Sequence, residues 1–308
     1  MSGVLDPTDA TDATGPTDAT PTDATPTGPP RAAMRKASVD RSVVRLTPTG
    51  RRTRRDRVAG EEPLEIRVVG PGSDPSTVAV TMRTPGHDFA LAVGFLTTEG
   101  ILREPAELKL VEYCTRGVGV EQLYNIVTVR LSRPVPDGVS RRALLTSASC
   151  GICGTTTLDD LESALPTPTK ASGPTLSGAL VVSLPERLRS EQTIFERTGG
   201  LHGVGLFDVT GNALFVREDI GRHNAVDKVI GEAVLGKAVA LQDTVLVVSG
   251  RVSFEIVQKA AMVGITMLVA VSAASSLAID AAQRFGITLV GFVRNGGANI
   301  YTHDHRIL

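Results

Sequence analysis

The sequence predicts a mixed α/β fold with two lobes of unequal size. Three observations predict it: the last hundred residues alternate apolar strands with helices, residues 64 to 131 are mostly short strands, and a stretch rich in Pro, Ser and Thr separates the two regions. We therefore expect a smaller, β-rich N-terminal lobe at residues 58–145 and an α/β lobe at residues 179–308. A flexible cysteine-bearing loop with its linker is expected between them, at residues 146–178.

The smaller lobe begins where apolar patterning starts, near Leu64. EIRVV (65–69) and TVAVTMR (77–83) are rich in β-branched residues and are separated by the turn-forming GPGSDP, so both are predicted strands. Residues 87–102 carry apolar side chains at helical spacing and predict a helix. The alternating YNIVTVRL (124–131) predicts another strand. The lobe is therefore expected to be mostly sheet, with one helix.

A helix followed by a hairpin is expected after the linker. The helix is predicted at about residues 184–197. VGLFDV (204–209) and ALFVRE (213–218) then flank Thr210, Gly211 and Asn212, a sequence typical of a turn between two antiparallel strands.

The last hundred residues carry the clearest pattern. Residues 243–249, 266–272 and 287–293 are apolar at nearly every position, which is typical of parallel strands buried on both faces. Helices are predicted between them, at 253–265 and 275–286. Right-handed crossovers would place the loops that leave the three strands on one edge of the sheet.

The loops at this edge combine small residues, hydroxyl groups and arginine. Small residues let a ligand approach the backbone, and the first two loops open helices whose N–H groups would face an anion. We therefore expect a phosphate-bearing ligand at this edge. The alternative is that Ser253 and Ser275 or Ser276 only cap helices. The loops consist of residues Ser249, Gly250 and Arg251, of residues 272–276, and of Arg294, Asn295, Gly296 and Gly297.

The N-terminal region differs in composition from the rest of the chain. Residues 1–30 repeat Thr, Asp, Ala and Pro and have no large apolar side chain after Leu5. Burial therefore cannot offset the ~1–2 kcal/mol per residue of backbone entropy that ordering costs. We expect residues 1–57 to be a disordered tail that ends in a basic run. That run is either a solvated tail end or an anion-contacting strand or arm; its members are Arg51, Arg52, Arg54, Arg55 and Arg57.

Charge and hydropathy restrict the partners and the compartment. The net charge is −1, so global electrostatics predict neither nucleic acid nor a membrane as a partner. The N-terminus lacks the basic and apolar regions of a secretory signal, and no segment reaches the ~18 uninterrupted apolar residues of a membrane span. We therefore expect a cytoplasmic protein.

The cysteines are the main candidates for chemistry. There are three, an odd number, and in a reducing cytoplasm such residues are more often catalytic or metal-binding than disulfide-bonded. Cys150 and Cys153 form a Cys-x-x-Cys pair whose neighbouring glycines would let both sulfurs reach an exposed tip. Sulfur chemistry is the favoured hypothesis, with metal binding as the alternative.

Three other interpretations of the cysteine pair fit less well. A structural zinc site needs four ligands, and the remaining cysteine, Cys114, stands alone in an apolar stretch. A thioredoxin-like motif should open a helix, whereas a Pro-rich stretch follows here. A zinc deaminase would have a His-x-Glu motif, and no histidine here has Glu two residues on.

Two histidines are candidate site residues. His202 in RTGGLHGVG and His223 in REDIGRHNAVDK are flanked by glycine and charge instead of apolar residues. Involvement in a site and an ordinary structural role are equally compatible with this setting.

Several long segments resemble the formate dehydrogenase accessory sulfurtransferase family, FdhD. They are TSASCGICG, TGGLHGVGLFD, REDIGRHNAVDKVIG, VSGRVSFEIVQKAAMVGI, VSAASSLAIDAAQRFGITLVGFVRNG and the closing IYTH. The resemblance runs from about residue 58 to the C-terminus and implies a sulfurtransferase accessory domain at residues 58–308. It also implies a cytidine deaminase-like three-layer α/β/α core without the zinc motif, assembled as a homodimer.

The resemblance implies a sulfur carrier. Members of the family take sulfane sulfur from a cysteine desulfurase as a persulfide and pass it to molybdenum held by two molybdopterin guanine dinucleotides. The sulfurated cofactor is then inserted into formate dehydrogenase. The family's persulfide cysteine matches Cys150, with Cys153 as its companion, so the chain is expected to be a sulfurtransferase without a permanent metal.

The resemblance also places the cofactor. The family's cofactor-binding segment matches Phe292, Val293, Arg294, Asn295, Gly296 and Gly297. Loop placement adds Ser249, Gly250, Arg251, His202, Asp219 and His223 to the expected binding residues. Two alternatives stay open: a chaperone that binds the molybdenum cofactor without sulfur chemistry, and a zinc-bound regulatory protein.

Overall fold

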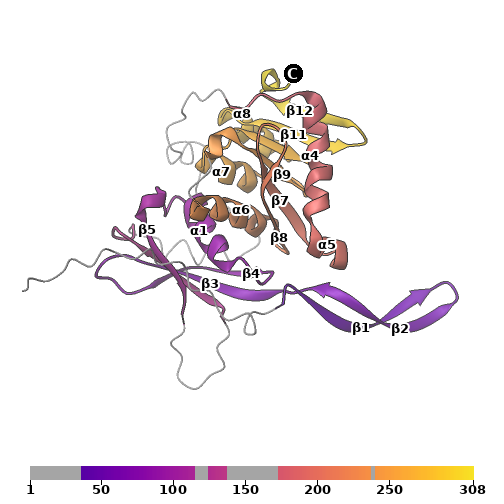
Figure 1. Cartoon of the computed structure of the whole chain (residues 1–308), viewed down its shortest axis with the longest axis horizontal. Coiled ribbons are helices and arrows are strands. Elements are labelled where there is room, and N and C mark those ends of the chain that lie inside the picture. The colour runs from indigo at the N-terminus through magenta and orange to yellow at the C-terminus, as the bar shows by residue number, and fades with distance from the viewer. Residues whose placement is uncertain (1–35, 115–123, 137–172, 237–239) are drawn as a thin grey trace, which may run out of the picture.

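The computed structural model describes residues 36–114, 124–136, 173–236 and 240–308. These residues form three sheets: a two-stranded hairpin, a four-stranded sheet and a six-stranded sheet (Figure 1). No helix in these ranges is long and apolar enough to cross a membrane. The expected cysteine loop and most of its linker lie outside the described residues.

The four-stranded sheet of the N-terminal lobe has the order β4-β3-β6-β5. β3 (Glu62–Val69) pairs antiparallel with β4 (Ser76–Arg83) and parallel with β6 (Ile126–Leu131), and β5 (Leu108–Tyr113) lies antiparallel to β6. Helix α1 (Asp88–Thr98) follows β4, and a short 3-10 turn (Pro105–Glu107) precedes β5. The predicted mostly-sheet lobe with one helix is confirmed.

The six-stranded sheet of the C-terminal lobe has the order β12-β11-β10-β9-β7-β8. The three central strands, β9 (Val245–Val248), β10 (Met267–Ala270) and β11 (Thr288–Arg294), are parallel, as predicted. Helices α7 (Phe254–Met262) and α8 (Ser276–Arg284) connect them. β7 (His202–Phe207) and β8 (Ala213–Asp219) form the predicted hairpin beside β9.

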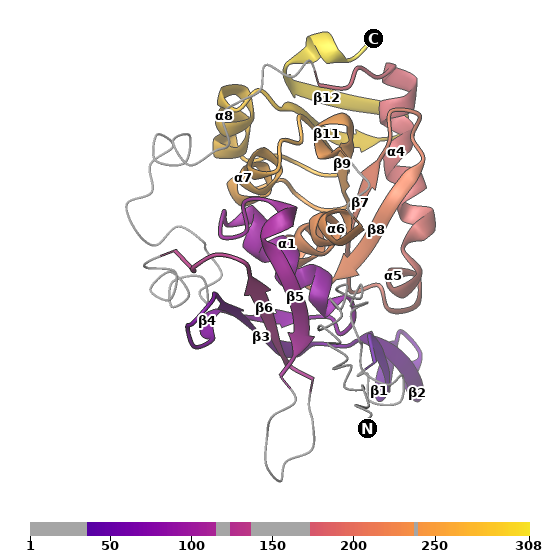
Figure 2. The same ribbon diagram turned by 60° about the vertical axis from the view of Figure 1, so that its left-hand side comes forward.

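Helices cover both faces of this sheet. Helix α4 (Gly178–Glu191) packs on one face over Val247, Val269 and Val290. Helices α6 (Arg222–Gly236), α7 and α8 cover the other face, over Leu246, Leu268 and Leu289 (Figure 2). Alternate residues of each strand therefore serve different cores, which explains why the strands are apolar at every position. The expected three-layer α/β/α arrangement is present.

Two glycines join the lobes where α1 crosses α6. A Cβ atom added at Gly94 would overlap the carbonyl oxygen of Asp227, and one added at Gly231 would overlap the carbonyl oxygen of Ala90. The two backbones thus approach too closely for any side chain at the crossing. Beside it, Lys259 on α7 donates to both carboxylate oxygens of Asp227, at 2.9 and 3.0 Å. The crossing fixes the smaller lobe on the larger one.

The expected disordered tail to residue 57 is wrong for its last part. Residues of the basic run lie in an antiparallel hairpin of β1 (Ser38–Thr47) and β2 (Gly50–Ala59). The register pairs the two strands over their full length, from Ser38 opposite Ala59 to Thr47 opposite Gly50. The Val residues of β1 and the Thr and Val residues of β2 supply β propensity that the arginines concealed. Residues 1–35 lie outside the described part.

Two further features of the C-terminal lobe differ from the prediction. The helix expected at 184–197 is two helices, α4 and the short α5 (Thr193–Thr198), which meet at Gln192. The C-terminal strand β12 (Gly297–Thr302) was not predicted; it pairs antiparallel with β11. Short 3-10 turns (Leu241–Asp243 and Asp304–Arg306) complete the lobe. A strand beginning with Gly-Ala-Asn gives little sequence signal because these residues have low β propensity.

Candidate functional site

Strand ends from three segments meet at the carboxyl edge of β9. Ser249, which follows β9, donates its backbone N–H to the Gly203 carbonyl at 2.9 Å, and the N–H of Gly203 donates to the Ser249 hydroxyl at 2.9 Å. His202 therefore begins β7 beside the end of β9, and it is paired across the hairpin with Asp219 at the end of β8. The structure thus brings together Ser249, His202 and Asp219, as loop placement predicted.

A glycine lies close beside His202. A Cβ atom added at Gly250 would lie 3.2 Å from His202 Nδ1, closer than most side-chain contacts. The loop after β9 is also joined to the loop after β10, because Val252 N–H donates to the Ala273 carbonyl at 3.0 Å and Ser275 N–H donates to the Val252 carbonyl at 3.0 Å. The first two predicted loops therefore form one continuous surface.

Asp219 has a structural role at this edge. Its carboxylate is fully buried, lies 2.7 Å from Lys228 Nζ and accepts the backbone N–H groups of Thr84 at 3.1 Å and Gly221 at 2.8 Å. Lys228 in turn donates to the Thr84 carbonyl at 2.8 Å. The predicted site residue therefore ties the N-terminal lobe and the start of α6 to the sheet edge, and its side chain faces away from solvent.

His223 lies in the first turn of α6, close to the start of α7. Its Nε2 is 3.2 Å from the Ser253 hydroxyl and 3.7 Å from a Glu255 carboxylate oxygen. Burial, and secondly the Arg222 guanidinium, lower the pKa of His223 to about 4, so the ring is neutral at pH 7. Ser253 makes no side-chain capping bond to α7, whereas Ser275 does cap α8 through Ala278 N–H at 3.2 Å. Both serines therefore stand at the N-cap positions of their helices, and only Ser275 caps its helix through its side chain.

Arginines give this edge a positive character. Burial, followed by Arg222 and then Arg251, lowers the pKa of His202, while Asp219 opposes the shift. Arg222 Nε is buried and has no hydrogen-bond partner among the described residues. A buried donor without a partner is costly, so this nitrogen is poised to bind an acceptor. With the positive ends of α6 and α7 nearby, the arrangement suits an anionic ligand.

Two residues near this edge, Arg222 and Glu255, were not among the predicted site residues. The contact of Ser253 with His223 was not predicted either. The signal for Arg222 was present, because it lies between the Gly221 turn and His223 at the start of a predicted motif. The burial of its Nε atom could not be read from the sequence, because arginine is usually exposed.

The third predicted loop is a tight hairpin turn instead of an open loop. Arg294 pairs with Gly297, and the two intervening residues, Asn295 and Gly296, have φ values of 53° and 74°. Positive φ at both positions is the geometry of a two-residue hairpin turn, which Asn-Gly favours. The turn continues the carboxyl end of β11, two strands from β9. It is thus on the same edge as His202 but separated from it by the loop after β10.

Val293 and Phe292, which belong to the segment expected to bind the cofactor, lie in different environments. Val293 is 2% exposed and packs in the core beneath α4, so its side chain is unavailable to a ligand, contrary to expectation. Phe292 has a φ of 52° at a register shift of the β11–β12 pair, and its N–H donates to the Ser272 carbonyl at 3.0 Å. Its ring lies under the Arg294 guanidinium, 5.3 Å from ring centroid to Cζ. Phe292 and Arg294 therefore form a stacked pair at the edge.

The predicted catalytic residues Cys150 and Cys153 lie outside the described residues. Cys114 is described, and it is partly buried.

Comparison with known proteins decides the family. The FdhD/NarQ family matches residues 59–308, which is most of the chain. The chain belongs to the FdhD/NarQ family. The resemblance found in the sequence motifs is therefore confirmed.

Curated members of the FdhD/NarQ family align with nearly their whole length. A protein of Nocardia farcinica is 48% identical over 276 residues, covering 88% of this chain and 95% of the relative. One of Streptomyces avermitilis is 46% identical over 278 residues, covering 89% and 97%. One of Mycobacterium tuberculosis is 45% identical over 280 residues, covering 89% and 100%. All three are named sulfur carrier protein FdhD.

A crystal structure supports the fold of this FdhD/NarQ chain. A protein of Desulfotalea psychrophila, assigned as a formate dehydrogenase accessory protein, superposes with a TM-score of 0.67 at 24% identity. The match covers 88% of this chain and 100% of that protein. At this identity the likeness establishes the shared fold.

Proposed function

We propose that this protein is a sulfur carrier for formate dehydrogenase, moving sulfur from a cysteine desulfurase to the molybdenum cofactor before that cofactor enters the enzyme. The observation that carries the proposal is the identity of 45–48% to relatives named sulfur carrier proteins, over nearly their full length. The Cys150-Gly-Ile-Cys153 segment supplies the thiols that such a role requires. The protein is then a sulfurtransferase with a cysteine persulfide intermediate.

The first step is a thiol exchange at sulfur. The Cys150 thiolate attacks the terminal sulfur of a persulfide on the desulfurase, the donor S–S bond breaks, and the donor cysteine leaves as a thiolate. Cys150 then carries the sulfane sulfur as Cys150–S–SH. No electrons are gained or lost overall, because one persulfide replaces another.

The second step needs two electrons if the sulfur is delivered as sulfide. The Cys153 thiolate can supply them by attacking Cys150 Sγ, which releases hydrosulfide and leaves a Cys150–Cys153 disulfide. A cellular dithiol then reduces this disulfide. Cys153 therefore acts as the resolving cysteine in the proposal, and a Cys153→Ala variant should load sulfur but deliver it poorly.

The molybdenum cofactor is the cargo in this proposal. Its two guanine dinucleotides are rich in phosphate, and the positive edge described above offers Arg222, Arg251 and the starts of α6 and α7 to phosphate oxygens. Neutral His202 and His223 can donate or accept hydrogen bonds without adding charge. The stacked Arg294–Phe292 pair and the Asn295-Gly296-Gly297 turn offer a second contact on the same edge.

The proposal includes an assembly and a compartment. We place the protein in the cytoplasm as a homodimer with a cytidine deaminase-like core, as the family resemblance implies. A reducing compartment suits the chemistry because both cysteines must return to the thiol state between cycles.

Mass spectrometry tests the persulfide directly. The protein is incubated with a cysteine desulfurase and cysteine, and peptides containing Cys150 are examined for one added sulfur atom. The wild type and a Cys114→Ala control should both gain the sulfur on Cys150, whereas Cys150→Ala should gain none in that peptide. Absence of added sulfur on wild-type Cys150 would contradict sulfur transfer. A chaperone that only binds the cofactor would then account for the relatives' link to formate dehydrogenase, and Cys150→Ala would still support enzyme maturation.

A further inference from the structure

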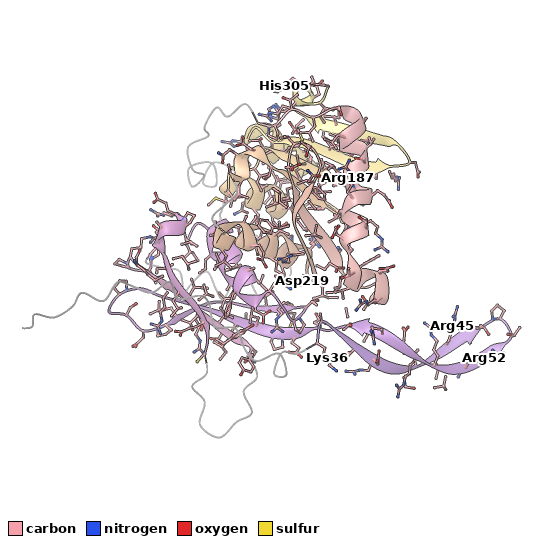
Figure 3. All side chains as sticks on the ribbon, in the orientation of Figure 1. Lys36, Arg45, Arg52, Arg187, Asp219 and His305 are labelled. Atoms are coloured by element: carbon pink, nitrogen blue, oxygen red, sulfur yellow. The ribbon has the colours of Figure 1, made fainter. Side chains whose placement is uncertain are left out.

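The β1–β2 hairpin, here called the arm, projects from the molecule as an isolated ribbon (Figure 3). In the described part of the chain its strands pair only with each other. Its base is held by Gly60 N–H, which donates to the Ala37 carbonyl at 2.8 Å, and by packing of β2 against α5. A two-stranded hairpin alone is marginally stable in water, so a binding partner would stabilise the outer half of the arm.

The arm carries a concentrated positive charge. Residues 36–59 contain eight Lys and Arg against two Asp, a net charge of +6 in a chain whose net charge is −1. Both Asp residues are already paired, Asp40 with Arg57 at 3.0 Å and Asp56 with Arg54 at 2.9 Å. Arg45 lies directly opposite Arg52, an arrangement of like charges that destabilises a hairpin. The outer half of the arm therefore fits an acidic surface.

One face of the arm combines this charge with exposed apolar side chains. Val44 is 63% exposed and Leu46 is 74% exposed. They share a face with Arg51 and Arg55, because Arg51 is the cross-strand partner of Leu46 and alternate residues of a strand point to the same side. An apolar centre flanked by arginine is typical of protein–protein interfaces.

Other classes of partner fit the arm less well. Residues 36–59 contain no Phe, Tyr or Trp, so they offer no ring on which nucleic-acid bases could stack. Two aliphatic side chains provide too little apolar area for insertion into a membrane. A protein surface with acidic groups around an apolar depression matches both properties of the arm.

We infer that the arm is the docking site for the client enzyme, apo-formate dehydrogenase, through an acidic surface of that enzyme. This inference rests on the proposed function. The position of the arm supports it: a Cβ atom added at Gly200 would lie 3.6 Å from Ala59 Cβ, and His202 follows two residues later. The base of the arm thus lies beside the positive edge from which the cofactor would be handed over.

Binding of purified apo-formate dehydrogenase to the full chain tests the inference. The test variant is Arg51→Gln/Arg55→Gln, and the matched control is Arg103→Gln/Lys109→Gln, which removes two positive charges from exposed positions of the N-terminal lobe. The Kd should rise about tenfold in the test variant and stay unchanged in the control, and wild-type binding should weaken with salt. Val44→Ser/Leu46→Ser should also weaken binding, with little dependence on salt.

Equal Kd values for the wild type and the arm variants would overturn the inference. So would loss of RNA binding, of anionic-vesicle binding or of self-association in the arm variants while enzyme binding persists. Circular dichroism and thermal unfolding of each variant check that the fold is intact. Failure of the proposed function is seen separately, because loading of sulfur on Cys150 by the desulfurase requires no client enzyme.

Discussion

Replacing Gly94 with alanine should destabilise the protein through the crossing of α1 and α6. The added Cβ would overlap the Asp227 carbonyl oxygen and lie 2.6 Å from its carbonyl carbon and 2.9 Å from Gly231 N. All three are backbone atoms, which cannot rotate away, so the helices must separate. Overpacking of this kind costs about 1–3 kcal/mol or more. The higher helix propensity of alanine offsets about 1 kcal/mol of this cost.

Because only backbone atoms would have to move, we take the upper end of that cost, and the expected net loss is about 2 kcal/mol in the free energy of unfolding. For a protein of this size, such a loss lowers the Tm by roughly 4–8 °C. Thermal unfolding followed by circular dichroism measures it. Gly236→Ala, at the end of the same helix α6, is the matched control, since among the described residues its Cβ would meet only Phe215 Cζ, at 3.8 Å. A Gly94→Ala protein as stable as the wild type would refute the role of the crossing.

Three further predictions concern single side chains. Asp88→Asn should lower the free energy of unfolding by about 3 kcal/mol in urea titrations, because it breaks the buried ion pair with Arg83, whose Nη2 lies 2.8 Å from the carboxylate; a loss below about 1 kcal/mol would contradict this. The pKa of His223 is about 4 in the folded protein against an ordinary 6.5, so the unfolded chain binds more protons between these values and stability must fall as the pH drops from 6.5 towards 4. The measurement is the urea midpoint of unfolding at each pH. His223→Gln should make this midpoint depend less on pH between 6.5 and 4. An unchanged dependence would show that other groups cause the loss of stability. GDP can serve as a probe for the guanine dinucleotide ends of the proposed cargo. Arg222→Met should weaken the binding of GDP about tenfold in calorimetry, because it removes the buried Nε donor, and equal affinity would place the phosphate elsewhere.

The α/β core could be predicted from sequence because its signals are local. Strands buried on both faces are apolar at every position, as in VLVV and MLVA, and the intervening helices have apolar faces. Chain-order rules then place the loop ends on one edge, which is why His202, Asp219 and Ser249 were found together. The environment of each residue was not predictable. Asp219 is neutralised by Lys228 and Val293 lies in the core, and both facts depend on contacts far apart in sequence.

The arm and the crossing escaped prediction for different reasons. Strand β2, with the sequence GRRTRRDRVA, was not recognised because it contains five arginines and few residues with high β propensity. Gly94 and Gly231 lie inside helical patterns, where glycine normally indicates a weak helix. Only the packing of α1 against α6 shows that each glycine is required by its partner helix.

If the protein carries sulfur as proposed, maturation of formate dehydrogenase requires the Cys150 thiol. Formate dehydrogenase activity should be measured in a strain lacking this gene and complemented with the wild type, Cys150→Ala or Cys114→Ala. We expect rescue by the wild type and by Cys114→Ala, and none by Cys150→Ala. Full rescue by Cys150→Ala would contradict sulfur transfer through Cys150 and leave the protein as a cofactor binder without sulfur chemistry.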